Sequence, residues 1–134
     1  MILGIGMDLF EIARLERLLE REGEDLLPEL FSSAEIEYGN RLRQPQHFFA
    51  RSFAAKEAVI KAIGSPELRG FYWRDIEIRT GGNVWYAVQF MGMVRDLIRK
   101  LRIESIHLSV EATDRFAIAV AVACGSLRKE QDHG

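Results

Sequence analysis

The chain has 134 residues, 48% of them hydrophobic and 28% charged, which is the composition of one globular domain with a sizeable core. Its 18 basic and 20 acidic residues leave a formal net charge of −2, which excludes a general attraction to nucleic acid or to an anionic membrane. The single cysteine, Cys124, excludes an internal disulfide and a cysteine-based zinc cluster.

The first half of the chain is predicted to be mainly helical after an initial strand. Residues 1–9 form an apolar stretch with two glycines, typical of a strand, and residues 10–21 repeat their apolar side chains with a helical period. Ser32 followed by Glu35 is a capping-box pattern, which predicts a helix over residues 33–42.

A longer helix follows a break at Pro45. We expect it over residues 47–63, ended by Gly64, Ser65 and Pro66. Its apolar side chains share one broad arc, and Lys56 falls inside that arc. Burying a charge is costly unless it is paired or bound to an ion, so this helix is a candidate for carrying a site.

The second half is predicted to alternate strands and one helix. Two strands over residues 75–80 and 84–90 flank a Gly81-Gly82-Asn83 turn, and residues 93–101 have a helical period. Two further strands over residues 103–110 and 116–124 precede a polar tail. The elements indicate an α+β fold with antiparallel strands packed against several helices, in one domain over residues 1–125 with a tail over 126–134.

Three residues form the main candidate site. Asp8 ends a glycine-containing strand, so its carboxylate either caps the next helix or lies where another backbone or ligand comes close. Glu57 and Lys61 are an i,i+4 pair, which is either a weak surface ion pair or part of a site. Two carboxylates from different elements suit Mg²⁺, whose remaining ligands are usually waters and phosphates, and a nearby lysine neutralises phosphate oxygens.

Two other sets of residues are either ordinary surface residues or parts of a binding site. Arg14, Arg17 and Arg21 form one stripe on the first helix, either a solvated face or a docking strip for an acidic partner. Ser109 and Glu111 point to the same side of their strand, and Glu111 would need a partner if that side were buried.

These motifs, in this order, resemble the small 4′-phosphopantetheinyl transferases of bacteria, the holo-acyl-carrier-protein synthases. The resemblance covers residues 1–124. Its strongest parts are Gly4-Ile5-Gly6-Met7-Asp8-Leu9 with Arg14, and Phe53-Ala54-Ala55-Lys56-Glu57-Ala58 with Lys61. A Lys-Glu pair alone is common, but this pair with Lys61, an N-terminal Gly-x-Asp and a length near 130 is a specific combination.

The resemblance implies a reaction and its residues. Such enzymes move the phosphopantetheine arm of coenzyme A onto a serine of an acyl carrier protein and release 3′,5′-ADP. Asp8 and Glu57 would then be the Mg²⁺ ligands, and Lys61 would steady the diphosphate and the leaving group. Glu57 or a metal-bound water would accept the serine proton, and Lys56 is expected near the nucleotide. Ser109 stands in the strand expected near coenzyme A.

The resemblance also implies an assembly and a location. Family members commonly form homotrimers with active sites between subunits, and they dock the acidic carrier protein on a basic first helix. Arg14 matches the motif arginine of that helix, whereas Arg17 and Arg21 extend the stripe by spacing alone. With no signal peptide and no membrane-spanning run in this sequence, we expect a cytoplasmic enzyme, with fatty-acid or polyketide carriers as equally compatible acceptors.

Two positions depart from the family pattern. Ser52 stands where an arginine is usual, and Arg51 lies one place earlier, which turns its side chain by about 100° around a helix. In the late strand, Ala112 replaces the usual histidine and is preceded by Glu111, whose charge would oppose a diphosphate unless a metal intervenes. We therefore also consider a non-catalytic relative that binds coenzyme A or a carrier as a scaffold or sensor, and a structural trimer module without a ligand.

Overall fold

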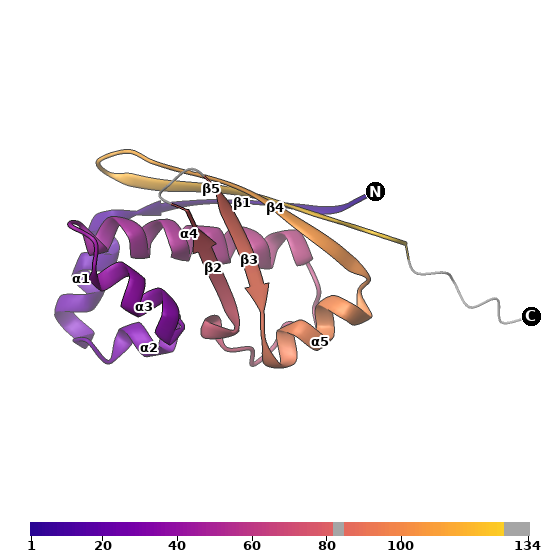
Figure 1. Ribbon diagram of the computed structural model, residues 1–134, viewed down its shortest axis with the longest axis horizontal. Helices are drawn as coiled ribbons and strands as arrows, with labels where there is room; N and C mark the ends of the chain where they lie inside the picture. The colour runs from indigo at the N-terminus through magenta and orange to yellow at the C-terminus, as the bar shows by residue number, and fades with distance from the viewer. Residues whose placement is uncertain (82–84, 128–134) are drawn as a thin grey trace, which may run out of the picture.

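A computed structural model describes residues 1–81 and 85–127 of the chain. The predicted α+β class is confirmed, because helices pack on antiparallel strands (Figure 1). In chain order the elements are β1 (Ile2–Glu11), α1 (Ile12–Glu22), α2 (Leu26–Leu30), α3 (Ser33–Asn40), α4 (Pro45–Ile63), the 3₁₀ turn η1 (Trp73–Asp75), β2 (Ile76–Thr80), β3 (Tyr86–Phe90), α5 (Gly92–Lys100), β4 (Ile103–Ala112) and β5 (Phe116–Gly125).

The larger sheet joins the two ends of the described chain. Its strand order is β1-β5-β4, antiparallel throughout, with Asp8 opposite Ala119 and Val110 opposite the same Ala119 on the other side. The long helix α4 runs along one face of this sheet (Figure 1). Every second residue of β5 from Ala117 to Ala123 is a fully buried alanine, and these small side chains let the helix lie close to the sheet.

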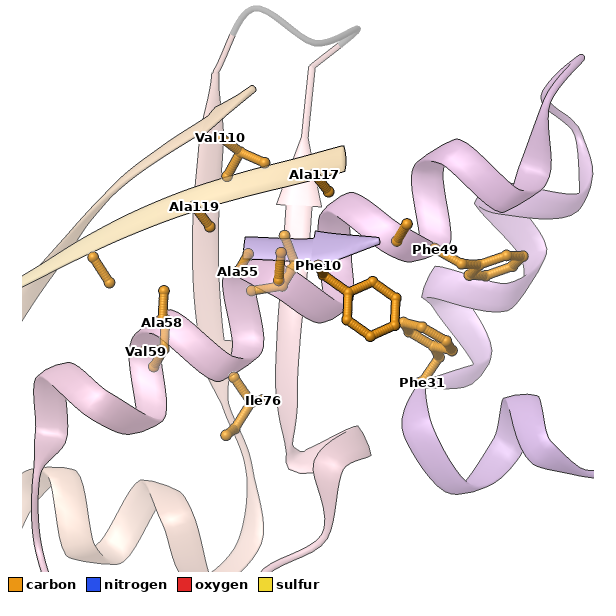
Figure 2. Packing of buried hydrophobic residues seen from close by; sticks show 14 of the residues in the cluster. Phe10, Phe31, Phe49, Ala55, Ala58, Val59, Ile76, Val110, Ala117 and Ala119 are labelled. Carbon is orange, nitrogen blue, oxygen red and sulfur yellow. The ribbon is translucent and has the colours of Figure 1, made fainter. Parts of the chain in front are cut away.

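The remaining elements complete a core around α4. The hairpin β2–β3 crosses α4, and its strand β3 contacts β4 of the larger sheet (Figure 1). Helices α1, α2 and α3 lie near the N-terminal half of α4, and α5 lies near its C-terminal end (Figure 1). Figure 2 shows Phe10, Phe31 and Phe49 gathered at one end of this core. Phe31 and Phe49 have ring centroids 4.9 Å apart. Aromatic side chains therefore pack the helices together at this end, whereas small alanines let α4 pack on the sheet.

The boundary between the first strand and the first helix differs from the prediction. Strand β1 continues to Glu11, and α1 begins at Ile12 rather than at residue 10. Phe10 stays in the strand because it pairs with Ala117 and packs edge-on against Phe53, where it is 4% exposed. Tertiary burial therefore overrides the helical period that this aromatic side chain suggested.

Other element boundaries shift by a few residues. The capping box at Ser32 is confirmed by both of its hydrogen bonds, although α3 ends at Asn40. Pro45, expected in a break, is the first residue of α4, a position that tolerates its missing N–H. The short helix α2 was not predicted, and β2 begins one residue later than expected. The turn residues Gly82 and Asn83 lie outside the described residues.

Within the described part of the chain, no helix combines the length and apolar character needed to span a membrane. The single-domain assignment, with its tail over residues 126–134, stays a prediction.

Candidate active site

Strand β1 touches the backbone of α4 because it carries glycines where the two elements cross. A Cβ built at Gly6 would overlap the carbonyl oxygen of Ala58, and a Cβ built at Gly4 would overlap that of Ala62. The close approach that the glycines suggested is therefore made to a helix backbone. Side chains alternate along a strand, so Asp8 points to the same face as Gly4 and Gly6, toward α4.

This crossing brings together the three residues predicted for the main site. Lys61, on α4, donates from Nζ to Asp8 Oδ1 over 3.2 Å and to the carbonyl oxygen of Met7 over 2.9 Å. The Asp8 side chain is 16% exposed and that of Lys61 is 52% exposed, so the pair is open to solvent on the lysine side. Asp8 is thus not the N-cap of the following helix, whose cap position is Glu11.

Glu57 completes the group, and its surroundings shift the pKa of its carboxyl group. Partial burial raises the pKa of Glu57, and the neighbouring Asp8 carboxylate raises it further, while Lys61 and Arg14 oppose these effects by lowering it. The structure therefore places the two predicted metal-ligating carboxylates close enough to repel each other. A cation bound by both carboxylates would reduce this repulsion further than Lys61 and Arg14 do.

The donor set limits which cation fits. Among the described residues, no group of three or more His, Cys, Asp and Glu side chains is placed to hold a metal ion. A protein site for Zn²⁺ or Ca²⁺ normally needs more protein ligands than two. Mg²⁺ fits the pair Asp8 and Glu57, because it is usually held by one or two carboxylates together with waters and substrate phosphates.

Lys56 lies on a different side of α4 from this group. Its side chain is 0% exposed, and its Nζ contacts Glu35 Oε1 at 2.7 Å. Nζ also donates to the carbonyl oxygens of Leu30, at 2.9 Å, and Trp73, at 3.1 Å. The structure confirms that a charge is buried inside the apolar arc, but it does not bring Lys56 to Asp8 and Glu57.

The three arginines of α1 surround one surface hollow. Arg14, Arg17 and Arg21 line it together with Leu18 and Glu20, and its volume is about 640 Å³. Arg17 lies 3.4 Å from Glu11 and Arg21 lies 3.5 Å from Glu22, in exposed ion pairs that contribute little to stability. Because Arg14 acts on the pKa of Glu57, the stripe extends to the edge of the Asp8–Glu57 group.

Ser109 and Glu111 lie on the opposite face of the larger sheet from α4. Val110, between them, is 7% exposed against the core, whereas both neighbours are exposed. The register places Ser109 opposite Val120, which in turn pairs with Met7, on the outer face. The structure therefore does not bring Ser109 or Glu111 to Asp8 within one chain.

The positions that depart from the family pattern lie away from Asp8 and Glu57. Ser52 is fully buried, and its hydroxyl has no hydrogen-bond partner among the described residues, so it faces no surface ligand. Arg51 lines a hollow of about 370 Å³ with Arg43 and His47 at the start of α4. Arg51 and Glu111 both act on the phenol of Tyr86, whose pKa burial raises. The sequence alone suggested neither this basic hollow nor the common influence of Arg51 and Glu111 on Tyr86.

Comparison with known proteins gives a consistent match over most of the chain. Residues 4–121 match the family model described as the 4′-phosphopantetheinyl transferase superfamily. Holo-[acyl-carrier-protein] synthases of Rhodopirellula baltica and Vibrio cholerae are 33% and 34% identical over 123 and 122 residues. The alignments cover 92% and 91% of this chain and 98% and 97% of those proteins.

Solved structures of similarly named proteins share the fold. The holo-[acyl-carrier-protein] synthase of Neisseria meningitidis superposes with a TM-score of 0.85 at 26% identity, covering 92% of this chain and 99% of that one. The Bacillus anthracis protein, in complex with CoA (3′,5′-ADP), has a TM-score of 0.72 at 29% identity, covering 94% and 99%. The Helicobacter pylori protein, in complex with coenzyme A, has a TM-score of 0.74 at 28% identity, covering 90% and 99%.

Proposed function

The chain belongs to the 4′-phosphopantetheinyl transferase superfamily, and from this premise we propose that it is a holo-acyl-carrier-protein synthase. It transfers the 4′-phosphopantetheine group of coenzyme A to a serine of an acyl carrier protein and releases 3′,5′-ADP. The observation that carries this conclusion is the meeting of Asp8, Glu57 and Lys61 where β1 crosses α4. The alternative of a catalytically weakened scaffold or sensor is not favoured, since relatives over nearly the whole chain are named as the synthase.

We assign Asp8 and Glu57 as the residues that hold Mg²⁺. When bound, the ion neutralises charge on the diphosphate of coenzyme A. Lys61 uses two N–H groups on Asp8 and the Met7 carbonyl, which orients the carboxylate and leaves a third N–H for a phosphate oxygen. Lys61 thereby stabilises the negative charge on the departing 3′,5′-ADP.

We assign the serine proton to Glu57. A side-chain carboxylate positioned beside the reacting groups is a suitable general base. As the proton moves to Glu57, the serine oxygen bonds to the phosphorus that carries the pantetheine arm. The bond from that phosphorus to the bridging oxygen breaks, and 3′,5′-ADP leaves with the electron pair.

We assign the docking of the acyl carrier protein to α1. An acidic partner complements Arg14, Arg17 and Arg21, and the arginine-lined hollow is wide enough to receive side chains of that partner. Because Arg14 lies nearest to Glu57, a carrier docked along the stripe approaches the site at its Arg14 end.

We also propose that the protein is a homotrimer. Ile5, Met7 and Leu9 are 61–62% exposed on the outer face of β1, and Ile118 of β5 continues this apolar face at 37%. An apolar sheet face of this kind is typical of an interface between subunits, and the number three comes from the family resemblance. Ser109 lies on the same face, so it contacts coenzyme A bound at a neighbouring subunit's site.

The assembly is tested by sedimentation of the wild-type protein and of Met7→Lys. We expect a trimer that the added charge dissociates, because a lysine in an apolar interface is costly to desolvate. A wild-type protein that sediments as a monomer at micromolar concentration would contradict the proposal.

The transfer reaction is tested by incubating the protein with coenzyme A, Mg²⁺ and apo-acyl-carrier protein. We expect the carrier to gain the mass of one phosphopantetheine arm, and we expect chelation of Mg²⁺ to stop the gain. If no carrier from the same organism gains this mass, the proposed function is wrong.

A further inference from the structure

The ammonium group of Lys56 has all of its hydrogen-bonding capacity occupied inside the protein. A lysine has three N–H donors and no acceptor. In Lys56 they reach Glu35 Oε1, the Leu30 carbonyl and the Trp73 carbonyl, at 2.7, 2.9 and 3.1 Å. With a side chain that is 0% exposed, Lys56 has no donor and no surface for a nucleotide. The expected contact between Lys56 and the nucleotide is therefore replaced by an internal one.

Both carboxylate oxygens of Glu35 also accept hydrogen bonds within the protein. Its Oε1 also accepts from the N–H of Ser32 at 2.8 Å, and its Oε2 accepts from the N–H of Ile78 at 3.1 Å. The Glu35 side chain is 1% exposed. Burial raises the pKa of Glu35 and lowers that of Lys56, and each partner opposes the shift of the other.

The pair connects α4 to four other elements. Leu30 ends α2, Ser32 and Glu35 begin α3, Trp73 belongs to η1, and Ile78 belongs to β2. Apolar residues of similar volume often stabilise a core as well as a buried ion pair or better, so stability alone does not explain these charges. Directional hydrogen bonds to several elements instead fix the orientation of the helix that carries Lys56.

The orientation of α4 decides where Glu57 and Lys61 point. Consecutive helical residues are turned by about 100°, so fixing Lys56 toward α3 directs Glu57 toward another side. Glycines at Gly4 and Gly6 hold the opposite side of the same helix against β1. Helix α4 is thus fixed from two sides, by close backbone packing on one and by the buried ion pair on the other.

We propose that Lys56 and Glu35 are positioning residues for the transfer reaction, whose ion pair fixes the rotation of α4 and so holds Glu57 and Lys61 against Asp8. This role rests on the proposed function of that site. Neither residue touches coenzyme A or the carrier protein. A misplacement of about 1 Å at reacting groups lowers turnover roughly 100-fold, which is the size of effect that such positioning controls.

The decisive variant is the double replacement Lys56→Met/Glu35→Leu. Lys56→Met alone leaves a buried, unpaired carboxylate, so we expect it to be poorly folded, whereas the double variant removes both charges and keeps an apolar core. We expect the double variant to keep a cooperative thermal transition and to lose kcat about 100-fold. Its affinity for 3′,5′-ADP in calorimetry should change less than about threefold, because neither side chain contacts the nucleotide.

Two further variants control this comparison. Arg41→Ala removes an exposed ion pair with Glu37 on the same helix as Glu35, and we expect its kcat to be unchanged. Lys56→Arg keeps the charge but changes the donor geometry, so we expect a folded protein with kcat reduced about tenfold. It provides the test if the double variant does not fold.

The outcomes separate the alternatives. Wild-type kcat in the folded double variant, or in Lys56→Arg should the double variant not fold, overturns the proposal. A preserved kcat with lost 3′,5′-ADP affinity overturns it in favour of a nucleotide contact.

A wild-type protein that transfers nothing refutes the proposed function, and the positioning role is then judged by nuclear Overhauser contacts between Lys61 and Met7. Their persistence in the double variant, or in Lys56→Arg should the double variant not fold, overturns the proposal, and their loss supports it.

Discussion

Two neighbouring residues of α4 lie in opposite electrostatic surroundings. Lys56 is sealed in the core with Glu35, and the polar atoms of that pair have partners within the chain. One position further along, Glu57 faces Asp8, a like charge, beside a half-exposed Lys61. The closed pair is complete without a ligand. In the open group two carboxylates repel each other and Lys61 is half-exposed, so this is the group to which we assign the cation and the diphosphate. Adjacent charged residues of one motif therefore have different roles, and the contacts that each side chain makes show which role it has.

The strongest test of the open group is Glu57→Gln. Loss of the carboxylate removes a metal ligand and the general base while keeping the size of the side chain, so we expect transfer to fall at least about 1,000-fold. The measurement is the rate of mass gain by the apo-carrier protein. Glu37→Gln, an exposed change on α3, serves as the control and should retain full activity. An active Glu57→Gln protein would show that the open group is not the reaction centre.

The approach of β1 to α4 is tested by Gly6→Ala. The added methyl group overlaps the carbonyl of Ala58 and would lie 2.8 Å from Cβ of Lys61, so the strand must move away from the helix. We expect a loss of about 1–3 kcal/mol in the free energy of unfolding and a fall in turnover of about 100-fold. Denaturant unfolding and the transfer assay measure the two effects, with Gln89→Ala as an exposed-strand control. Unchanged turnover would mean that the site does not depend on this contact.

These two elements also show what could be predicted from sequence. The grouping of Asp8 with Glu57 and Lys61 was predicted because these residue types suit a site for Mg²⁺ and phosphate, and because their order resembles the family motif. The role of Lys56 was not, because two of its three partners are the backbone carbonyls of Leu30 and Trp73, which no residue type reveals, and Glu35 is recognisable in the sequence only as part of a capping box. Sequence period showed that Lys56 is buried, but only tertiary structure shows that its charge is satisfied internally. Ser109 was likewise predicted to lie near the ligand. The sequence did not show that it lies on the face of the larger sheet opposite to α4.

The docking strip on α1 is tested by Arg17→Glu/Arg21→Glu. Reversing two exposed charges removes the attraction to an acidic carrier without touching the open group, so we expect the KM for the carrier to rise about tenfold. The KM for coenzyme A should stay the same, and the difference between variant and wild type should shrink at high salt. Arg41→Glu, away from α1, controls for net charge. An equal rise in both KM values would contradict a docking role.

The smallest expected effect is in the titration of Glu57. In the metal-free protein we expect a pKa above the ordinary glutamate value, because burial and Asp8 both disfavour the charged form. Asp8→Asn removes the like charge and should lower the pKa of Glu57, whereas Lys61→Met removes an opposite charge and should raise it. Carbon-13 NMR titration of the side-chain carboxyl measures both changes. An unchanged pKa in Asp8→Asn would mean that the two carboxylates do not interact.

The central claim is that the open group binds coenzyme A through a cation held by Asp8 and Glu57. Calorimetric titration of coenzyme A into the protein, with Mg²⁺ and again with a chelator, tests it most directly. We predict that the wild-type affinity falls at least about tenfold when Mg²⁺ is removed, and that Asp8→Asn shows the weak affinity under both conditions. Equal affinity for coenzyme A with and without Mg²⁺ in the wild-type protein would contradict the account.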